Sequence, residues 1–140
     1  MPNANETGVR RLVLVLGDQL SRESAAFDGF DRAADAVLMM ELAEEATLVP
    51  QHKARLALFF AAMRHFRDGL RADGVDVHYT ALEDEASGGG FAAEIARRAR
   101  AIRPKSLVVC QPGDWRAVSY THLRAHETGR HISYAVFCLK

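Results

Sequence analysis

The fold is decided by LVLVL at residues 12–16, five consecutive aliphatic residues that stand between two arginines and the pair Gly17-Asp18. A short unbroken apolar run of this kind is typical of a strand buried on both faces, as in a parallel sheet. The segment AVLMME at residues 36–41 repeats the pattern and ends in a carboxylate. The two segments predict two buried strands, each followed by polar residues.

Helical segments are predicted to alternate with these strands. Residues 50–72 begin with a proline, which the first turn of a helix tolerates, and carry apolar residues three and four positions apart. Residues 75–80 (VDVHYT) alternate and predict a third strand, residues 91–102 predict a second helix, and residues 107–110 a fourth strand. Such alternation implies parallel pairing with right-handed crossovers. We therefore expect an α/β fold with a doubly wound, Rossmann-like parallel sheet that stops after about four strands.

The composition excludes several classes of protein. The 140 residues are 49% hydrophobic and 26% charged, which is ordinary for a globular protein and unlike a disordered one. No apolar run reaches the length of a membrane-spanning helix, and the polar first residues predict no secretory signal. Two cysteines make no disulfide framework, so we expect a reducing cytoplasm as the location.

Two histidines near the end of the chain resemble a zinc site but lack a residue that the zinc-binding motif requires. His122 and His126 have the spacing of two zinc ligands on one helix face. The corresponding protease signature also needs a glutamate directly after the first histidine, and Leu123 stands there. The sequence therefore predicts no metal site.

A nucleotide-level pattern explains this tail better. Residues 118–128 and residues 132–139 can be encoded by codons that resemble the two constant parts of a transposase-type sequencing-library adapter, in the adapter's order. We therefore expect residues 117–140 to be a non-native tail. Residues 1–116 are then an incomplete domain whose gene continues past Arg116.

The charge of the chain argues against a nucleic-acid module. The formal net charge is zero, with 18 basic and 18 acidic residues. Removing the three basic residues and the one acidic residue of the tail leaves 15 basic and 17 acidic residues. A mildly acidic body has no electrostatic footprint for nucleic acid and none for a polybasic membrane anchor.

Polar residues gather where the predicted strands end. Asp18, Glu41 and Glu45 follow two strands and the turn at residues 111–115 follows a third, and doubly wound sheets bind ligands beyond such carboxyl ends. Carboxylates there can accept hydrogen bonds from ring N–H groups or sugar hydroxyls, and Gly17 lets a flat ring approach the backbone. No nucleophile has a base partner in a known motif, so binding is favoured over catalysis. Helix caps and solvated carboxylates explain the same residues equally well.

Four segments then appear in order: LVLVLGDQLS at 12–21, ELAEEATLV at 41–49, HK at 52–53 with AMRHF at 62–66, and PGDWR at 112–116. As a set they resemble the amino-terminal domain of the cryptochrome/photolyase family. More narrowly, the chain is similar to the iron–sulfur bacterial cryptochromes and prokaryotic (6-4) photolyases, the deoxyribodipyrimidine photolyase-related proteins.

The resemblance implies a light-driven DNA-repair flavoprotein. In this family the α/β domain holds an antenna chromophore, in this branch a ribityl lumazine, whose excitation energy reaches reduced FAD in a helical carboxyl-terminal domain. The FAD pocket, the 4Fe-4S cluster and the surface that contacts damaged DNA belong to that second domain, which this sequence lacks, so the chain itself is expected to be non-catalytic. The motifs carry over a set of chromophore-facing residues: Gly17, Asp18, Met40, Glu41, Glu45, Lys53 and Phe59.

Two other classes of function stay open. A stand-alone nucleotide-binding α/β protein would act by small-molecule binding or transferase chemistry, and a nucleotide would shift its melting temperature. An interaction module would use the basic face of the first long helix. It would lose its partner on charge reversal at Arg64 and Arg67.

Overall fold

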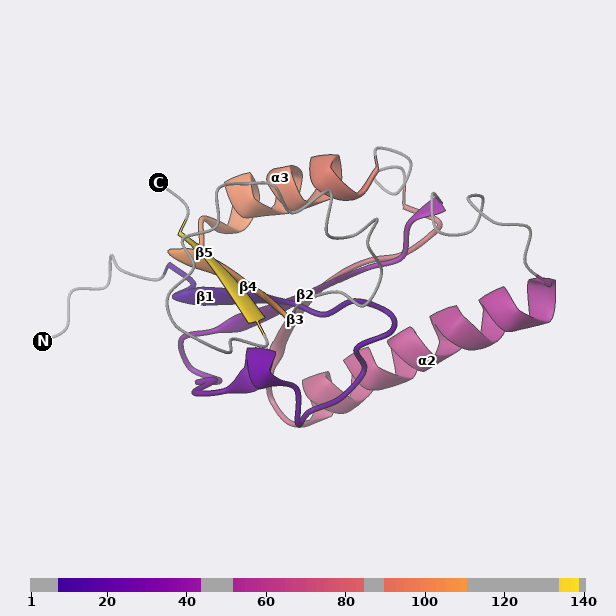
Figure 1. The fold of residues 1–140 in the computed structure, drawn as a ribbon, viewed down its shortest axis with the longest axis horizontal. Coiled ribbons are helices and arrows are strands. Elements are labelled where there is room, and N and C mark those ends of the chain that lie inside the picture. Colours follow the sequence, from indigo (N-terminus) through magenta and orange to yellow (C-terminus); the bar gives the residue numbers. More distant parts are fainter. Residues whose placement is uncertain (1–7, 44–51, 85–89, 111–133, 139–140) are drawn as a thin grey trace, which may run out of the picture.

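The protein forms one sheet with a helix on each face (Figure 1). The computed structural model describes residues 8–43, 52–84 and 90–110 and the backbone of residues 134–138. The strand order is β3-β2-β1-β4-β5, and the first four strands are parallel to one another. These strands are β1 (Arg11–Leu14), β2 (Ala36–Met40), β3 (Asp76–Thr80) and β4 (Ser106–Cys110).

The unbroken apolar runs are buried on both faces, as predicted. Every residue of β2 is buried, and in β1 the side chains alternate between two separate core clusters. Leu12 and Leu14 pack with Ile95 of α3 (Phe91–Ile102). Val13 packs with Met63 and other residues of α2 (Lys53–Ala72) on the opposite face. The predicted Rossmann-like α/β class is therefore confirmed.

The order of the strands reverses once. From β1 the chain adds β2 and then β3 on one side, whereas β4 lies on the other side of β1. The carboxyl ends of β1 and β4 meet at this reversal, with Leu14 in register with Val109. In doubly wound sheets this switch point is where ligands bind.

A fifth strand was not predicted. β5 (Tyr134–Cys138) pairs antiparallel with β4, although the tail at residues 117–140 was expected to lie outside the fold. Strand pairing uses backbone groups, so the open edge of β4 accepts an extended segment whatever its side chains. The non-native origin of the tail therefore stays a prediction.

The helix boundaries follow from local chemistry. α2 begins after His52, whose Nδ1 accepts a hydrogen bond from the N–H of Ala54 at 3.2 Å, while the predicted start at residue 50 lies outside the described residues. It ends at the predicted place, where Gly74 adopts a φ of +79°. Glycine enters this left-handed region without the steric cost that a Cβ atom brings. No helix in the described part of the chain is long and apolar enough to cross a membrane.

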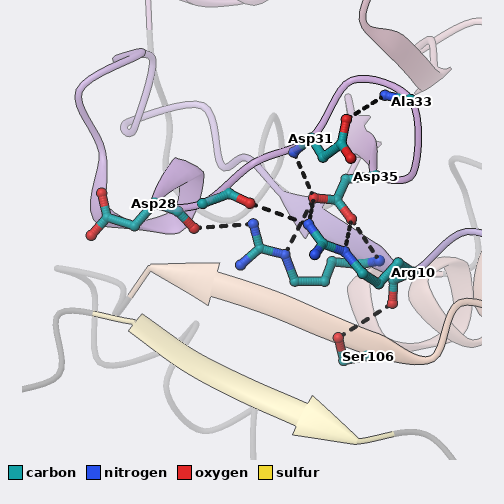
Figure 2. A network of polar contacts seen from close by, with 8 residues as sticks. Arg10, Asp28, Asp31, Ala33, Asp35 and Ser106 are labelled. Carbon is teal, nitrogen blue, oxygen red and sulfur yellow. Dashed lines mark hydrogen bonds and ion pairs between the residues drawn. The ribbon is translucent and has the colours of Figure 1, made fainter.

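One buried carboxylate links the amino-terminal ends of two strands of the sheet (Figure 2). Asp35 accepts hydrogen bonds from Arg10 at 2.8 and 2.6 Å and from the N–H of Asp31 at 2.9 Å. Burial raises the pKa of Asp35, but these hydrogen bonds and the charge of Arg11 outweigh it and lower the pKa to about 2. The network joins the starts of β1 and β2 at the edge opposite the switch point.

Candidate functional site

The switch point brings two of the predicted site residues together. A Cβ atom built on Gly17 would lie 2.2 Å from Cζ of Phe59, so the ring of Phe59 stands directly against the Gly17 backbone. The loop after β1 is also tied to the end of β4, because Gln19 Nε2 donates to the carbonyl of Cys110 at 3.2 Å. The ring that lies against the Gly17 backbone is therefore that of Phe59 of α2, and the approach of a ligand ring to Gly17 stays a prediction.

The other predicted site residues occupy different environments. Asp18 is exposed, and no hydrogen bond or ion pair joins its carboxylate to the described residues. Lys53 is exposed in the first turn of α2, whereas Met40 is 5% exposed and packs in the core cluster on the α3 face. Glu45 and the turn at residues 111–115 lie outside the described residues.

Glu41 lies at the end of β2 and is completely buried. Arg64 of α2 binds its carboxylate with two hydrogen bonds, from Nε to Oε1 at 2.7 Å and from Nη2 to Oε2 at 2.8 Å. The hydroxyl of Tyr79 donates to Oε1, and the N–H of Leu82 donates to Oε2 at 2.9 Å. Each carboxylate oxygen thus accepts two hydrogen bonds from within the protein.

These contacts keep Glu41 ionised. Burial raises its pKa, but the hydrogen bonds from Arg64 and Tyr79 outweigh burial and lower it below its ordinary value. Burial and the bond to Glu41 together raise the pKa of Tyr79, so the phenol keeps its proton. A carboxylate with all its acceptor positions in use holds β2, β3 and α2 together and does not serve as a general base.

Two arginines on the basic face of α2 have partners within the molecule. Arg64 also reaches Glu83, with Nη2 3.0 Å from both carboxylate oxygens. Arg67 bonds Asp68 and stacks on the ring of Tyr79, with 4.5 Å between the guanidinium carbon and the ring centroid. Charge reversal at Arg64 would break these contacts within the molecule. Loss of a partner protein in that variant would therefore not distinguish a lost interaction surface from a damaged core.

A second buried carboxylate lies on the other face of the sheet. Glu94 of α3 is 1% exposed and accepts hydrogen bonds from Thr80 Oγ1 at 2.5 Å, Arg97 at 2.8 Å and Arg98 at 3.1 Å. Burial raises the pKa of Glu94, and these bonds outweigh it and lower the pKa to about 2. The spacing of Glu94, Arg97 and Arg98 places all three on one side of a helix turn, and this signal was present in the sequence.

The arrangement indicates binding chemistry at the switch point. Glu41 and Glu94 are both neutralised by arginines, which leaves Asp18 as the exposed acid beside Gly17. Within residues 8–43, 52–84 and 90–110, no cluster of three His, Cys, Asp or Glu side chains is arranged to hold a metal ion. A hydrogen-bonding acid next to a backbone surface and an aromatic ring suits a planar, hydroxyl-bearing ligand.

Two comparisons with known proteins bear on the family of the chain. The family model described as deoxyribodipyrimidine photo-lyase-related protein matches residues 13–135. The chain is 42% identical over 109 residues to a (6-4) photolyase of Agrobacterium fabrum (strain C58 / ATCC 33970), an alignment that covers 78% of this chain and 22% of that relative. The chain thus spans about a fifth of the length of the curated relative that it matches. The chain therefore belongs to the deoxyribodipyrimidine photo-lyase-related protein family.

Proposed function

We propose that this chain is the antenna domain of a photolyase-related flavoprotein and that it binds a light-harvesting pigment at the switch point. The observation that carries the proposal is the surface formed by Gly17, Asp18 and Phe59 beside the junction of β1 and β4. Family membership adds the expectation of a pigment, in this branch a ribityl lumazine. When bound, such a pigment would supply light absorption, with its excitation energy serving reduced FAD in another part of the longer protein.

The residues present fit such a pigment in chemical terms. Asp18 offers a carboxylate to ring N–H groups or to the hydroxyls of a ribityl chain. The ring of Phe59, which lies against the backbone of Gly17, offers an apolar surface of the kind on which a planar ring system packs. Lys53 is an exposed cation at the start of the same helix, and we expect Glu45 to supply a second carboxylate.

Glu41 and Met40 take a supporting part in this proposal. Glu41 has no acceptor position left for a ligand, because Arg64, Tyr79 and Leu82 use both oxygens. Its role under the proposal is to keep the carboxyl ends of β2 and β3 in a fixed position against α2. Met40 lies in the core beneath that edge and would shape it through packing.

The activity of the longer protein follows as a further part of the proposal. A curated relative that is named (6-4) photolyase extends well beyond the aligned segment, which covers 22% of it. We infer that a second domain carries the FAD, the 4Fe-4S cluster and the contact with damaged DNA. The protein would act in the cytoplasm by electron transfer from reduced FAD to a pyrimidine photoproduct, with no membrane partner.

The test uses the full-length protein purified with its bound groups. Asp18→Asn together with Glu45→Gln removes both carboxylates that we assign to the pigment while leaving side-chain size unchanged. We expect absorbance beyond that of the flavin to disappear and the FAD content to stay constant. The matched control is Asp28→Asn together with Glu23→Gln, which makes the same chemical changes at two exposed positions outside the proposed site.

The outcomes separate cleanly. Pigment absorbance that survives in the Asp18 and Glu45 double variant at the wild-type level would defeat the site assignment. A wild-type protein that carries FAD but no second chromophore would defeat the antenna role. A protein that carries neither, and whose melting temperature rises with an added nucleotide, would support the nucleotide-binding alternative.

A further inference from the structure

β3 forms one edge of the sheet, and its backbone groups alternate between two directions. On the inner side, the N–H of Glu41 donates to the carbonyl of Thr80 at 2.8 Å, so Thr80 faces β2. Backbone groups of alternate residues in a strand point to opposite sides. Val77 and Tyr79 therefore present their N–H and C=O groups to the outer edge, and no strand in the described part of the chain pairs there.

Both outward carbonyls are already bonded to arginine side chains. Arg71, near the end of α2, donates from Nη2 to the carbonyl of Val77 at 3.0 Å. Arg98 of α3 donates from Nη2 to the carbonyl of Tyr79 at 3.2 Å. α2 and α3 cover opposite faces of the sheet (Figure 1). The hydrogen bonds of the two arginines therefore reach one edge from two sides. A strand added at this edge would need these same two acceptors.

The two arginines differ in the hydrogen bonds that hold their side chains in place. Arg98 is fixed by Glu94, with Nε 3.1 Å from Oε1, and by Thr80, with Nη2 2.9 Å from Oγ1. The structure gives Arg71 an exposed position, and its hydrogen bond to Val77 is its contact with this edge. Arg98 is thus a fixed part of the buried Glu94 cluster, and Arg71 can be replaced without disturbing a buried carboxylate.

We propose that Arg71 and Arg98 close the outer edge of β3 against pairing with a second copy of this chain. The strand is self-complementary, because an antiparallel pair centred on His78 sets Val77 of each copy opposite Tyr79 of the other. Each copy then supplies the N–H and C=O groups of both residues to the new ladder. Such a two-fold contact is the commonest way in which identical chains associate, and an open strand edge is its usual route.

The experiment compares two double variants of the full-length protein. Arg71→Met with Arg98→Met frees both carbonyls while keeping the length of the apolar side-chain stems. Arg67→Met with Arg97→Met is the matched control, since it removes one arginine from each of the same helices without freeing an edge carbonyl. Sedimentation equilibrium gives the dissociation constant of any dimer.

We expect the Arg71 and Arg98 double variant to dimerise with a Kd at least about tenfold lower than the wild type, a change of about 1.4 kcal/mol. The control should keep the wild-type value. Hydrogen exchange at the amides of Val77 and Tyr79 should slow as the concentration of the first variant rises, because those amides become donors in the new ladder.

Two results would overturn the proposal. One is an Arg71 and Arg98 double variant that keeps its native circular dichroism spectrum and associates no more than the wild type. The other is a control that associates equally well. If loss of Arg98 unfolds the protein by leaving the Glu94 carboxylate short of a partner, Glu94→Gln is added to both double variants, and equal Kd values in the two triple variants reject the role of the edge.

Discussion

The buried carboxylate of Glu41 allows a sharp test of what holds the carboxyl edge together. Glu41→Gln keeps the shape of the side chain and removes its charge. The carboxylate accepts two hydrogen bonds from Arg64, at 2.7 and 2.8 Å, and one each from Tyr79 and Leu82. The amide nitrogen of a glutamine donates hydrogen bonds and cannot accept them. The two donors that face the replaced oxygen therefore lose their acceptor and meet another donor.

The magnitude follows from burial. A hydrogen bond to a charged group contributes ~1.5–3 kcal/mol, and breaking a buried ion pair from one side costs ~3–5 kcal/mol. Glu41 is fully buried, but the Arg64 side chain is 39% exposed and also contacts Glu83, so water and Glu83 partly compensate the arginine. We therefore expect Glu41→Gln to lower the free energy of unfolding by about 3 kcal/mol, at the low end of that range. In a domain of this size the midpoint of thermal unfolding falls by about 10 °C.

The matched control is Glu83→Gln, because Glu83 contacts the same arginine from the exposed side. An exposed pair contributes at most about 1 kcal/mol, so this variant should unfold close to the wild-type temperature. Urea unfolding followed by circular dichroism measures both variants. Equal losses in the two variants, or a loss below about 1 kcal/mol in Glu41→Gln, would refute the argument that burial makes this pair important.

Three further outcomes follow from the structure. Gly17→Ala should lower the free energy of unfolding by ~1–3 kcal/mol, because the added Cβ meets the Phe59 ring. Phe59→Leu in the same chain should recover part of the loss. A Gly17→Ala protein as stable as the wild type would contradict the close packing of the two residues. Acid should destabilise the protein between about pH 5 and pH 2, because Glu94 has a pKa of about 2 when folded and 4.5 when unfolded, so the unfolded chain binds the proton first. Urea midpoints against pH should fall less steeply in Glu94→Gln, and identical slopes would exclude this origin. Gly74→Ala should lower the free energy of unfolding by about 1 kcal/mol, because alanine is strained at a φ of +79°. An unchanged midpoint of thermal unfolding in this variant would contradict that reasoning.

Several features were predictable from the chain alone because they depend on short-range patterns. The runs at residues 12–16 and 36–41 predict strands buried on both faces, and every residue of β2 is buried. The proximity of Gly17 to an aromatic ring was not predictable, since Phe59 is 42 positions further along the chain. Its approach depends on how α2 crosses the sheet.

The candidate site was predicted only in part for a related reason. Sequence position places Glu41 and Asp18 at strand ends but leaves open which way each side chain turns. The tertiary structure turns Glu41 inward, where Arg64 and Tyr79 neutralise it, and leaves Asp18 exposed at the switch point. Ionisable side chains look alike in a sequence, and burial decides which of them hold the fold and which remain accessible to a ligand.

The class of fold, the family and the order of the first four strands and two helices could be predicted from the chain, because strand and helix periodicity and short motifs are local properties. The three-dimensional arrangement was needed to show that β3 ends the sheet, that Arg71 and Arg98 meet its outward carbonyls, and that β5 joins β4. These features depend on contacts between residues distant in the chain, which form when the helices pack on the sheet and bury its two faces.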